Sequence, residues 1–428
     1  MSNAYARDVS IIGVGYTPIG DVRKAPEILN FTERELFAMA SIEAMQDCGI
    51  KANEIDAFYV GMSGANYDAK MKSAAAQFGE WIGMRHKPSV FHDEGCSTMA
   101  FGLEMAVNAV ASGKYDIVLT GAVNVNTCTP EPCRVPFERA PMASEMLWNN
   151  VYTAMDAAYE KPGFGGSGPV DAVGIRYAAQ YGLTLDQLDE TLMHYILSKR
   201  KEALLNPKAL MATRSYEDEA KMFGFASPEA YLTSDKFNPR VGAAIRARYL
   251  GQTNVDGASA VIVCASNLAG RFLKQPIRVA GVATGTCMSN HFSTMPNEAD
   301  RKLFARLYDM AGITDPYHEI EYFSVHDCPC DMILTVSEEA GYFHPGEAWR
   351  FMRDKRLTFD QDKPIATTGG RTQSGHPRSP AFGIEIAEAV AQMRGENGAR
   401  QMAKAPRTSV LWGGGTGWNI GAAVLKKD

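Results

Sequence analysis

The chain has 428 residues, a net charge of −6 and eight cysteines, and 46% of its residues are hydrophobic. This length and composition are typical of a soluble enzyme with two or three domains, and the weak negative charge excludes an electrostatic basis for binding nucleic acid or an anionic membrane. No apolar run reaches the roughly 20 residues that span a bilayer. The cysteine usage fits a reducing compartment, so we expect a cytoplasmic protein without a secretion signal.

The elements predicted along the chain form a series that repeats once. Three segments of the first half recur in the same order in the second half, and we interpret this as an internal duplication. A generic alternation of strands and helices is the alternative. The matched pairs are Ile11–Val14 with Val279–Val282, Ile55–Val60 with Ile320–Val325, and Ala100–Ala106 with Ala381–Ala387.

Two copies of a strand–helix–strand unit predict an α/β fold with two parallel-containing sheets flanked by helices. Residues 1–270 would form the first half and residues 271–428 the second. The pattern breaks between about 126 and 240, where prolines, a glycine-rich run and helical stretches indicate an inserted region over one face.

Basic residues gather in the second part of this insertion. A solvated helical surface explains them, and a phosphate-binding face for a nucleotide-tailed substrate is the sharper interpretation. They are Lys199, Arg200, Lys201, Lys208, Arg214, Lys221, Lys236 and Arg240.

Cys96 is the strongest candidate for a nucleophile. It directly precedes a stretch that reads as a buried helix, and it is followed by Ser97 and Thr98. A thiol in the first turn of a helix lies near the positive end of the helix dipole and near unpaired N–H groups, which favour the thiolate. Buried cysteines are more often inert, so the neighbouring candidates decide the interpretation.

Those neighbours are His326 and Cys328, just after a predicted strand, and His376, which precedes the second-copy helix as Cys96 precedes the first. The duplication therefore predicts that Cys96 and His376 approach each other as a nucleophile and its base. We expect no metal, because neither Cys328 with Cys330 nor Cys128 with Cys133 has a second ligand pair at zinc-site spacing.

A glycine run, Gly413 to Gly417 with Thr416, follows a predicted strand. Glycines let backbone N–H groups approach a developing oxyanion, and such a run could equally cradle a phosphate. Its spacing fits neither the P-loop nor the dinucleotide fingerprint.

These motifs together resemble the thiolase superfamily over nearly the whole chain. The family's Asn-x-x-Cys-Ser motif resembles the segment at Cys96, and Gly-His-Pro resembles Gly375–Pro377. Two matches are typical of the sterol-carrier-protein type: His-Asp-Cys-Phe resembles His326–Pro329, and Leu-Arg-Gly-Glu-x-Gly-Ala-Arg-Gln resembles Met393–Gln401.

The resemblance implies a five-layered αβαβα fold from two pseudo-symmetric halves with an inserted loop domain. It also implies residue roles. Cys96 would carry the acyl group, His376 would activate it, and Cys328 would be the second acid/base. His326 would donate to the enolate oxygen, and the backbone N–H groups of Cys96 and Gly413 would hold the tetrahedral oxyanion.

The chain departs from the family at three places near the reacting centre. Leu411 stands where many thiolases carry their second catalytic cysteine, and Pro329 replaces the Phe of His-Asp-Cys-Phe. Arg378 and the residues after it replace a small apolar stretch. An Arg beside Met99, Phe382 and Trp412 suggests a branched or aromatic 3-oxoacyl-CoA with a free carboxylate, such as benzoylsuccinyl-CoA. A salt bridge of Arg378 with a nearby acid is the alternative.

The resulting hypothesis is a CoA-dependent thiolase, an acyltransferase that cleaves a 3-oxoacyl-CoA or runs the reverse Claisen condensation. Coenzyme A would be a co-substrate, with no permanently bound cofactor. We expect a homodimer or higher oligomer, and the resemblance also implies a small partner with a zinc ribbon and an OB-like fold. A thiolase-like retro-aldol lyase and a non-catalytic acyl-CoA-binding subunit are the rival interpretations.

Overall fold

We describe a computed structural model of the chain. It describes residues 7–63, 73–127, 168–241, 245–251, 255–287, 298–415 and 419–427. The Pro-rich start of the predicted insertion, with Cys128 and Cys133, lies outside these residues, as do Thr416 and Gly417.

The described strands form one nine-stranded mixed sheet in the order β3-β2-β4-β5-β1-β6-β9-β8-β7. The first five belong to the N-terminal half and the other four to the C-terminal half. The strands are β1 Val9–Tyr16, β2 Ala57–Gly61, β3 Ser89–His92, β4 Ile117–Asn124, β5 Gly257–Ala265, β6 Ile277–Thr286, β7 Tyr322–Val325, β8 Thr408–Gly415 and β9 Asn419–Lys426.

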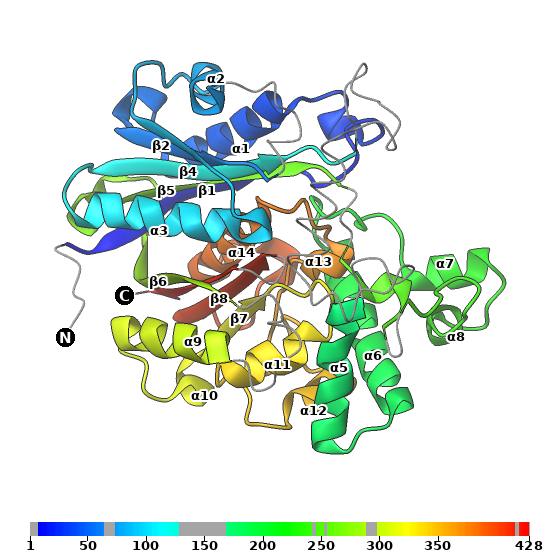
Figure 1. Ribbon diagram of the computed structural model, residues 1–428. Helices are drawn as coiled ribbons and strands as arrows, with labels where there is room; N and C mark the ends of the chain where they lie inside the picture. The colour runs from blue at the N-terminus through cyan, green and yellow to red at the C-terminus, as the bar shows by residue number, and fades with distance from the viewer. Residues whose placement is uncertain are drawn as a thin grey trace.

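Helices α3 and α14 lie side by side between the two halves of the sheet, α1 and α2 cover the outer face of the first half, and α9 and α11 cover that of the second (Figure 1). This is the five-layered α/β fold that the resemblance implies. The described helices are α1 Glu33–Cys48, α2 Ala74–Trp81, α3 Thr98–Ala111, α5 Gly168–Tyr181, α6 Leu185–Leu204, α7 Tyr216–Met222, α8 Pro228–Leu232, α9 Glu298–Ala311, α10 Pro316–Glu319, α11 Met332–Glu339, α12 Ala348–Arg353, α13 Gly370–Gln373 and α14 Ala381–Arg394.

The two halves repeat the same strand pairings. In the first half β2 runs parallel to β4, which is antiparallel to β5, which is antiparallel to β1; β7, β8, β9 and β6 repeat this pattern. The second half keeps a trace of an equivalent of β3. Phe323 on β7 forms a parallel bridge with Ile365, at the position where β2 pairs with β3 in the first half. The predicted internal duplication is confirmed by this shared topology.

A bulge occurs at the equivalent place in both first strands, between Ile11 and Gly13 in β1 and between Val279 and Gly281 in β6. A side chain at Gly13 would overlap the backbone of α1, and one at Gly281 would press on Leu307 of α9. Both copies therefore need a glycine where the first helix of the unit crosses its strand.

One prediction differs from the structure: the two sheets are continuous. β1 pairs with β6 through Ser10 with Arg278 and Ile11 with Ile277, a short antiparallel contact that joins the halves edge to edge. β1 and β6 are the first strands of the two copies. Each lies at an edge of its own half of the sheet and pairs there with the other.

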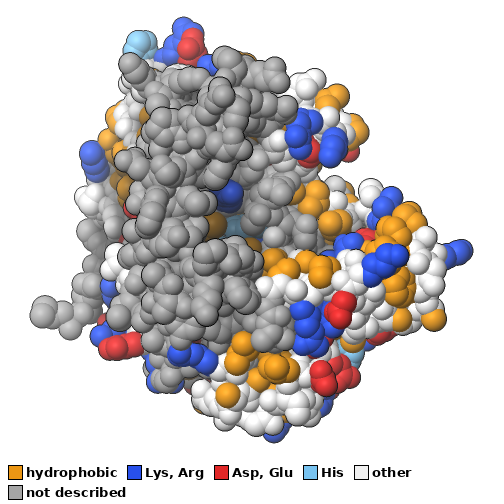
Figure 2. Space-filling model, turned by 45° about the vertical axis from the view of Figure 1, so that its right-hand side comes forward, with side chains coloured by type: hydrophobic (Ala, Val, Ile, Leu, Met, Phe, Trp, Pro, Cys, Tyr) orange, Lys and Arg blue, Asp and Glu red, His pale blue; other side chains and the backbone are white. Residues whose placement is uncertain are grey.

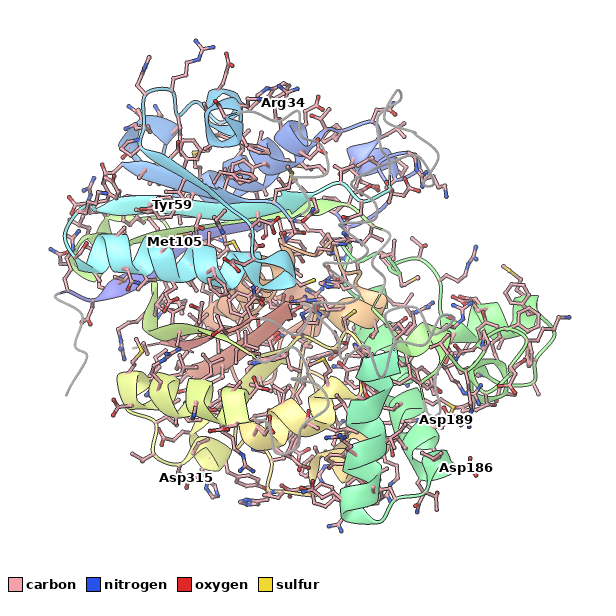
Figure 3. All side chains as sticks on the ribbon, viewed as in Figure 1. Arg34, Tyr59, Met105, Asp186, Asp189 and Asp315 are labelled. Carbon is pink, nitrogen blue, oxygen red and sulfur yellow. The ribbon has the colours of Figure 1, made fainter. Side chains whose placement is uncertain are left out.

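Three large buried apolar clusters of the described residues fill the spaces between the layers. The middle cluster combines α3 and α14 with the inner faces of both halves, and Tyr59 on β2 packs there with Met105 on α3 (Figure 3). The outer clusters lie under α1 and under α9 and α11. The central helices α3 and α14 are buried on nearly every side, which explains their apolar sequences. No helix in the described ranges is both long and apolar enough to cross a membrane.

Helices α5 to α8 follow β4 in sequence and project beside the C-terminal half (Figure 1). On the face in Figure 2, apolar and basic side chains lie close together on this projection, where Met222 is 58% exposed. α6 begins with Thr184, whose side chain accepts from the Gln187 N–H while Gln187 bonds back to Thr184. The exact domain boundaries stay a prediction.

Both interpretations of the basic cluster are wrong for two of its members. Lys199 is fully buried, 2.5 Å from Glu202 and 3.0 Å from the Leu357 carbonyl oxygen. Arg200 is 2% exposed and forms an ion pair with Glu219 at 2.9 Å. Lys199 joins the insertion to the C-terminal half, and Arg200 joins two parts of the insertion, so these charges face neither solvent nor a phosphate.

Candidate active site

Cys96 lies in a 3₁₀ turn, Gly95–Ser97, that leads directly into α3. The turn is held from both halves: the Ser97 hydroxyl is 3.4 Å from the carbonyl oxygens of Gly413 and Asn419, in β8 and β9. The Thr98 hydroxyl donates to the Gly95 carbonyl at 2.6 Å. The position of Cys96 is therefore fixed by backbone and hydroxyl contacts on either side of it.

The structure changes the expected protonation of Cys96. Burial raises the pKa of this thiol above its usual value, and Arg378 and Arg371 lower it only in part. The helix dipole was expected to favour the thiolate. In the free protein the desolvation of the charged sulfur is the larger effect, so a base must remove the proton.

His326 directly follows β7 and is 5% exposed. Its backbone N–H bonds to the Trp412 carbonyl at 3.1 Å. Burial first, and then Arg371, lower the pKa of His326 to about 3. The imidazole is therefore neutral and carries one N–H on its ring.

Cys328 lies two residues further on and is partly exposed. A side chain at Gly251 would overlap the Cys328 sulfur, so glycine is needed where this segment passes the thiol. Burial, followed by the nearby Cys96 sulfur, raises the pKa of Cys328 to about 12. The group is therefore a protonated thiol, and it lies close enough to Cys96 to interact electrostatically with it.

His376 is 1% exposed, and its Nδ1 has no hydrogen-bond partner among the described residues. Its ring centre is 4.6 Å from that of His326, in an edge-on arrangement. Burial, with His326 and Arg371 adding to it, holds the pKa of His376 well below its usual value. A neutral, buried imidazole with a free nitrogen is suited to accept a proton.

His326, Cys328 and His376 each present one ligand atom, and these atoms lie within 4.8 Å of one another. Two imidazoles and a thiol are donors that zinc accepts. The spacing of ligands along the sequence does not reveal this group, because the fold joins residues from two separate loops.

Ser379 is a residue that the sequence analysis passed over. Its hydroxyl accepts from the Ser63 N–H at 2.8 Å and lies 3.2 Å from the Gly95 carbonyl oxygen, to which it donates. Its own N–H bonds to the Asn124 side chain at 3.2 Å. This buried serine ties the His376 loop to the Cys96 turn. A lone serine beside a recognised motif gives no sequence signal for such a role.

Arg378 is partly exposed and has a positive φ of 63°. A non-glycine residue in this region carries a strain of about 1–3 kcal/mol, which the surrounding contacts must offset. Its charge acts on both Cys96 and His376. Among the described residues no ion pair involves Arg378, so the alternative of a salt bridge with a nearby acid finds no support there.

The other expected substrate contacts lie deeper. Met99 and Phe382 are at most 1% exposed and belong to the core between the halves, and Phe382 packs against Gly413. Trp412 is 1% exposed, bonds to Asp300 at 2.8 Å, and has its ring 6.5 Å from that of His326. These side chains support the walls of the site rather than line an open pocket.

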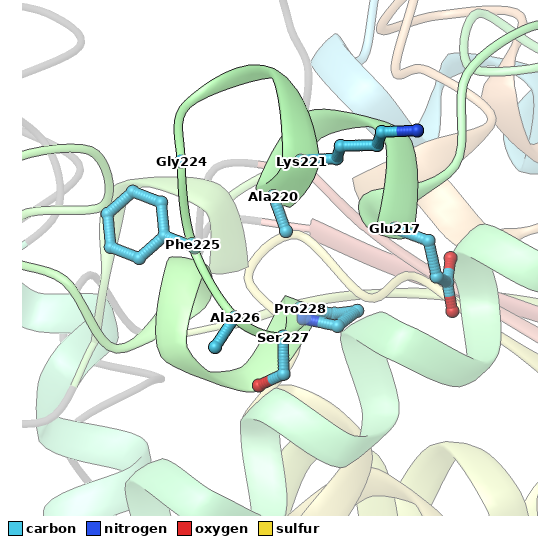
Figure 4. A pocket seen from close by; sticks show the side chains of 8 residues that line it. All are labelled: Glu217, Ala220, Lys221, Gly224, Phe225, Ala226, Ser227 and Pro228. Atoms are coloured by element: carbon cyan, nitrogen blue, oxygen red, sulfur yellow. The ribbon is translucent and has the colours of Figure 1, made fainter.

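A separate groove of about 610 Å³ lies at the far end of the insertion, between α7 and α8 (Figure 4). None of the candidate catalytic residues lines it. The lining residues are Glu217, Ala220, Lys221, Gly224, Phe225, Ala226, Ser227 and Pro228.

Comparison with known proteins agrees with this geometry. The family described as "Thiolase C-terminal domain-like" matches residues 285–427. An acetyl-CoA acetyltransferase of Methanothermobacter thermautotrophicus is 26% identical over 98% of this chain and 100% of its own length. The benzoylsuccinyl-CoA thiolase subunit BbsB of Thauera aromatica is 25% identical over 96% of this chain and 95% of its own.

Solved structures show the same fold. An Ltp2–ChsH2(DUF35) aldolase has a TM-score of 0.75 at 18% identity, covering 99% of both chains. A monomeric SCP2-thiolase-like protein type 1 from Mycobacterium smegmatis has a TM-score of 0.67 at 16% identity, covering 99% of this chain and 78% of its own.

The fold and its duplicated halves are those of the thiolase superfamily, and residues 285–427 match its C-terminal domain. Over nearly its whole length the chain is similar to proteins named acetyl-CoA acetyltransferase and thiolase subunit.

Proposed function

We propose that the chain is a thiolase that cleaves a 3-oxoacyl-CoA with free CoA, or runs the reverse Claisen condensation, through an acyl-enzyme on Cys96. The proposal rests chiefly on one observation. His326, Cys328 and His376 present their reactive atoms within 4.8 Å of one another, beside the Cys96 turn. Thiolase names among the relatives and CoA-bound thiolases among the similar structures support CoA as the co-substrate.

In the cleavage direction His376 takes the proton of Cys96, and the sulfur attacks the 3-oxo carbon. The N–H groups of Cys96 and Gly413 receive the oxyanion. The bond between carbons 2 and 3 then breaks, leaving an acyl-enzyme and an enolate of the second acyl-CoA. His326 donates to the enolate oxygen and Cys328 protonates carbon 2. The Cys328 thiolate then takes the proton of the CoA thiol, the CoA sulfur takes the acyl group from Cys96, and the released Cys96 recovers its proton from His376.

The protonation states support this division of labour. Cys328, with its pKa raised to about 12, holds the proton that the carbanion needs. His376 is neutral and free at Nδ1, as a base must be. His326 is neutral, so its ring carries one N–H, which we assign to the enolate oxygen.

We assign to Arg378 the recognition of a substrate carboxylate. It lies beside the reacting groups without an ion-pair partner among the described residues, and a guanidinium binds a carboxylate with two parallel hydrogen bonds. The candidate substrate is a branched or aromatic 3-oxoacyl-CoA with a free carboxylate. The name of the Thauera relative, a benzoylsuccinyl-CoA thiolase subunit, supports this class.

We further propose that the chain acts as a homodimer or larger oligomer with a small zinc-ribbon and OB-fold partner. The word "subunit" in the name of the Thauera relative and the two proteins named in the aldolase complex support a partner. Full activity of the purified chain, eluting as a dimer without a second protein, would remove the need for that partner.

A retro-aldol lyase is the second candidate, favoured by the fold similarity to an aldolase. Intact mass after exposure to a panel of acyl-CoAs separates the possibilities. A thiolase gains an acyl adduct on Cys96. A retro-aldol lyase cleaves a 3-hydroxyacyl-CoA without an adduct, and a binding subunit does neither. Absence of any adduct with every acyl-CoA that is cleaved would overturn the thiolase proposal.

A further inference from the structure

Asp327 stands between His326 and Cys328 but has its side chain in the protein interior, fully buried. Its carboxylate accepts the Arg371 backbone N–H at 2.5 Å and the Tyr195 hydroxyl at 2.8 Å. The Thr372 hydroxyl adds a contact at 3.3 Å. One carboxylate therefore joins the His326–Cys328 segment to α13 and to α6 of the insertion.

The chain makes room for this junction with two glycines. A side chain at Gly370 would overlap the Asp327 carboxylate, and one at Gly369 would press on Ala203 of α6. Both have positive φ, 63° and 103°. The segment before α13 thus passes between the insertion and Asp327 in a conformation that glycine permits and other residues resist.

The insertion holds the same region at two further points. Arg200 on α6 donates to the Gln373 side chain at 2.7 Å, and the N–H of Leu210, after α6, bonds to the Ser374 carbonyl at 2.9 Å. Among the described contacts, those that fix the Cys96 turn come from β8, β9 and Ser379 instead. The insertion is therefore connected to the acid/base segment more directly than to the nucleophile.

We propose that the buried Tyr195 hydroxyl is a positioning group for the carbon–carbon bond step. Through Asp327 it fixes the backbone of the His326–Cys328 segment, so that the insertion sets the placement of the enolate donor and of the acid/base thiol. This inference rests on the proposed thiolase function, because it takes its roles for His326 and Cys328 from there.

Tyr195→Phe tests the inference, because it removes one hydroxyl and leaves the ring. We expect carbon–carbon cleavage to slow by about 10-fold, while the formation of the Cys96 adduct from a simple acyl-CoA stays within twofold of wild type. The matched control is Tyr177→Phe. Tyr177 is equally buried on α5 and its hydroxyl lies 2.5 Å from Glu338, so it reports the loss of a similar bond elsewhere.

A second readout does not depend on activity. Releasing the segment should expose Cys328, so its labelling by iodoacetamide, followed by peptide mass spectrometry, should rise at least threefold in Tyr195→Phe over Tyr177→Phe. If Tyr195→Phe folds poorly, Thr372→Val removes a weaker bond to the same carboxylate and should change the same quantities in the same direction by less.

Unchanged Cys328 labelling would overturn the inference even if the protein proves not to be a thiolase. An equal loss in adduct formation and in carbon–carbon cleavage would also overturn it, since that pattern indicates general destabilisation. Failure of wild type to form any acyl adduct would instead reject the proposed function, and the labelling result would then stand on its own.

Discussion

Helices α3 and α14 are copies of one element, yet their starts carry different chemistry. Ahead of α3 a tight turn presents the partly exposed thiol of Cys96. Ahead of α14 a longer segment places His376, 1% exposed, five residues before the helix and follows it with Arg378 at positive φ. The duplication brings two helix starts to the middle of the molecule, and the segments before them determine which group lies there.

The strands show the same division. β2 and β7 are equivalent strands. None of the candidate catalytic residues directly follows β2, whereas β7 is followed at once by His326 and Cys328. The first half thus supplies the candidate nucleophile, and the second half supplies the candidates for the base, the donor and the acid. Substitutions in the two halves should therefore affect different steps of the reaction.

Cys96→Ala should have the largest effect on the reaction, because it removes the only candidate nucleophile that we assign to the first half. Loss of the nucleophile should reduce thiolysis by about 10⁴–10⁶-fold, the range found when a covalent nucleophile is removed, and the acyl adduct should disappear from the intact mass. Cys287→Ala is the control, because Cys287 is also partly exposed but lies outside the cluster. An adduct that persists in Cys96→Ala would assign the nucleophile elsewhere.

Cys328→Ala should separate the halves. The adduct on Cys96 should still form, while carbon–carbon cleavage slows by about 10²–10⁴-fold, the usual range for acid/base catalysis. Cys330→Ala offers a neighbouring control, since Cys330 is fully buried in the core. Normal cleavage by Cys328→Ala together with a loss in Cys330→Ala would transfer the acid/base role to Cys330.

Arg378→Met addresses the residue by which the second helix start differs most from the family. We expect the preference for a carboxylated 3-oxoacyl-CoA over its uncharged analogue to fall by about 2–5 kcal/mol, because a desolvated charge pair loses one partner. The measurement is the ratio of kcat/KM for the two substrates. The same ratio in wild type and variant would show that Arg378 does not recognise the carboxylate.

The sequence was sufficient for the duplication, because glycine and apolar positions repeat wherever a helix must cross a strand closely. Gly13 and Gly281 are the clearest case, since each lies at a bulge of equivalent position. It was also sufficient to select Cys96, His326, Cys328 and His376 as candidates. Their roles remain predictions.

The remaining features depend on tertiary contacts that no local pattern encodes. Lys199 and Arg200 look like surface charges in sequence, and only their partners Glu202 and Glu219 show that they are buried. The sequence shows Asp327 only as a residue between His326 and Cys328, and the structure adds its hydrogen bonds with Tyr195 and Arg371. Desolvation of Cys96 likewise depends on what surrounds the turn, and a helix position alone predicted the wrong direction for its pKa.

The smallest expected effect is on the pH dependence of Cys96 alkylation, which tests whether burial raises the pKa of this thiol. Iodoacetamide reacts with the thiolate, and burial raises the pKa of Cys96 above its usual value, so labelling of the free enzyme should still be rising at pH 9. Arg378 lowers this pKa, so Arg378→Met should shift the profile to higher pH and slow labelling at pH 8, where a smaller fraction of the thiol is ionised. Peptide mass spectrometry at several pH values measures both quantities. A plateau below pH 8 in wild type would instead mean that the start of α3 stabilises the thiolate, and that the two helix starts differ less in their electrostatics than the burial of Cys96 indicates.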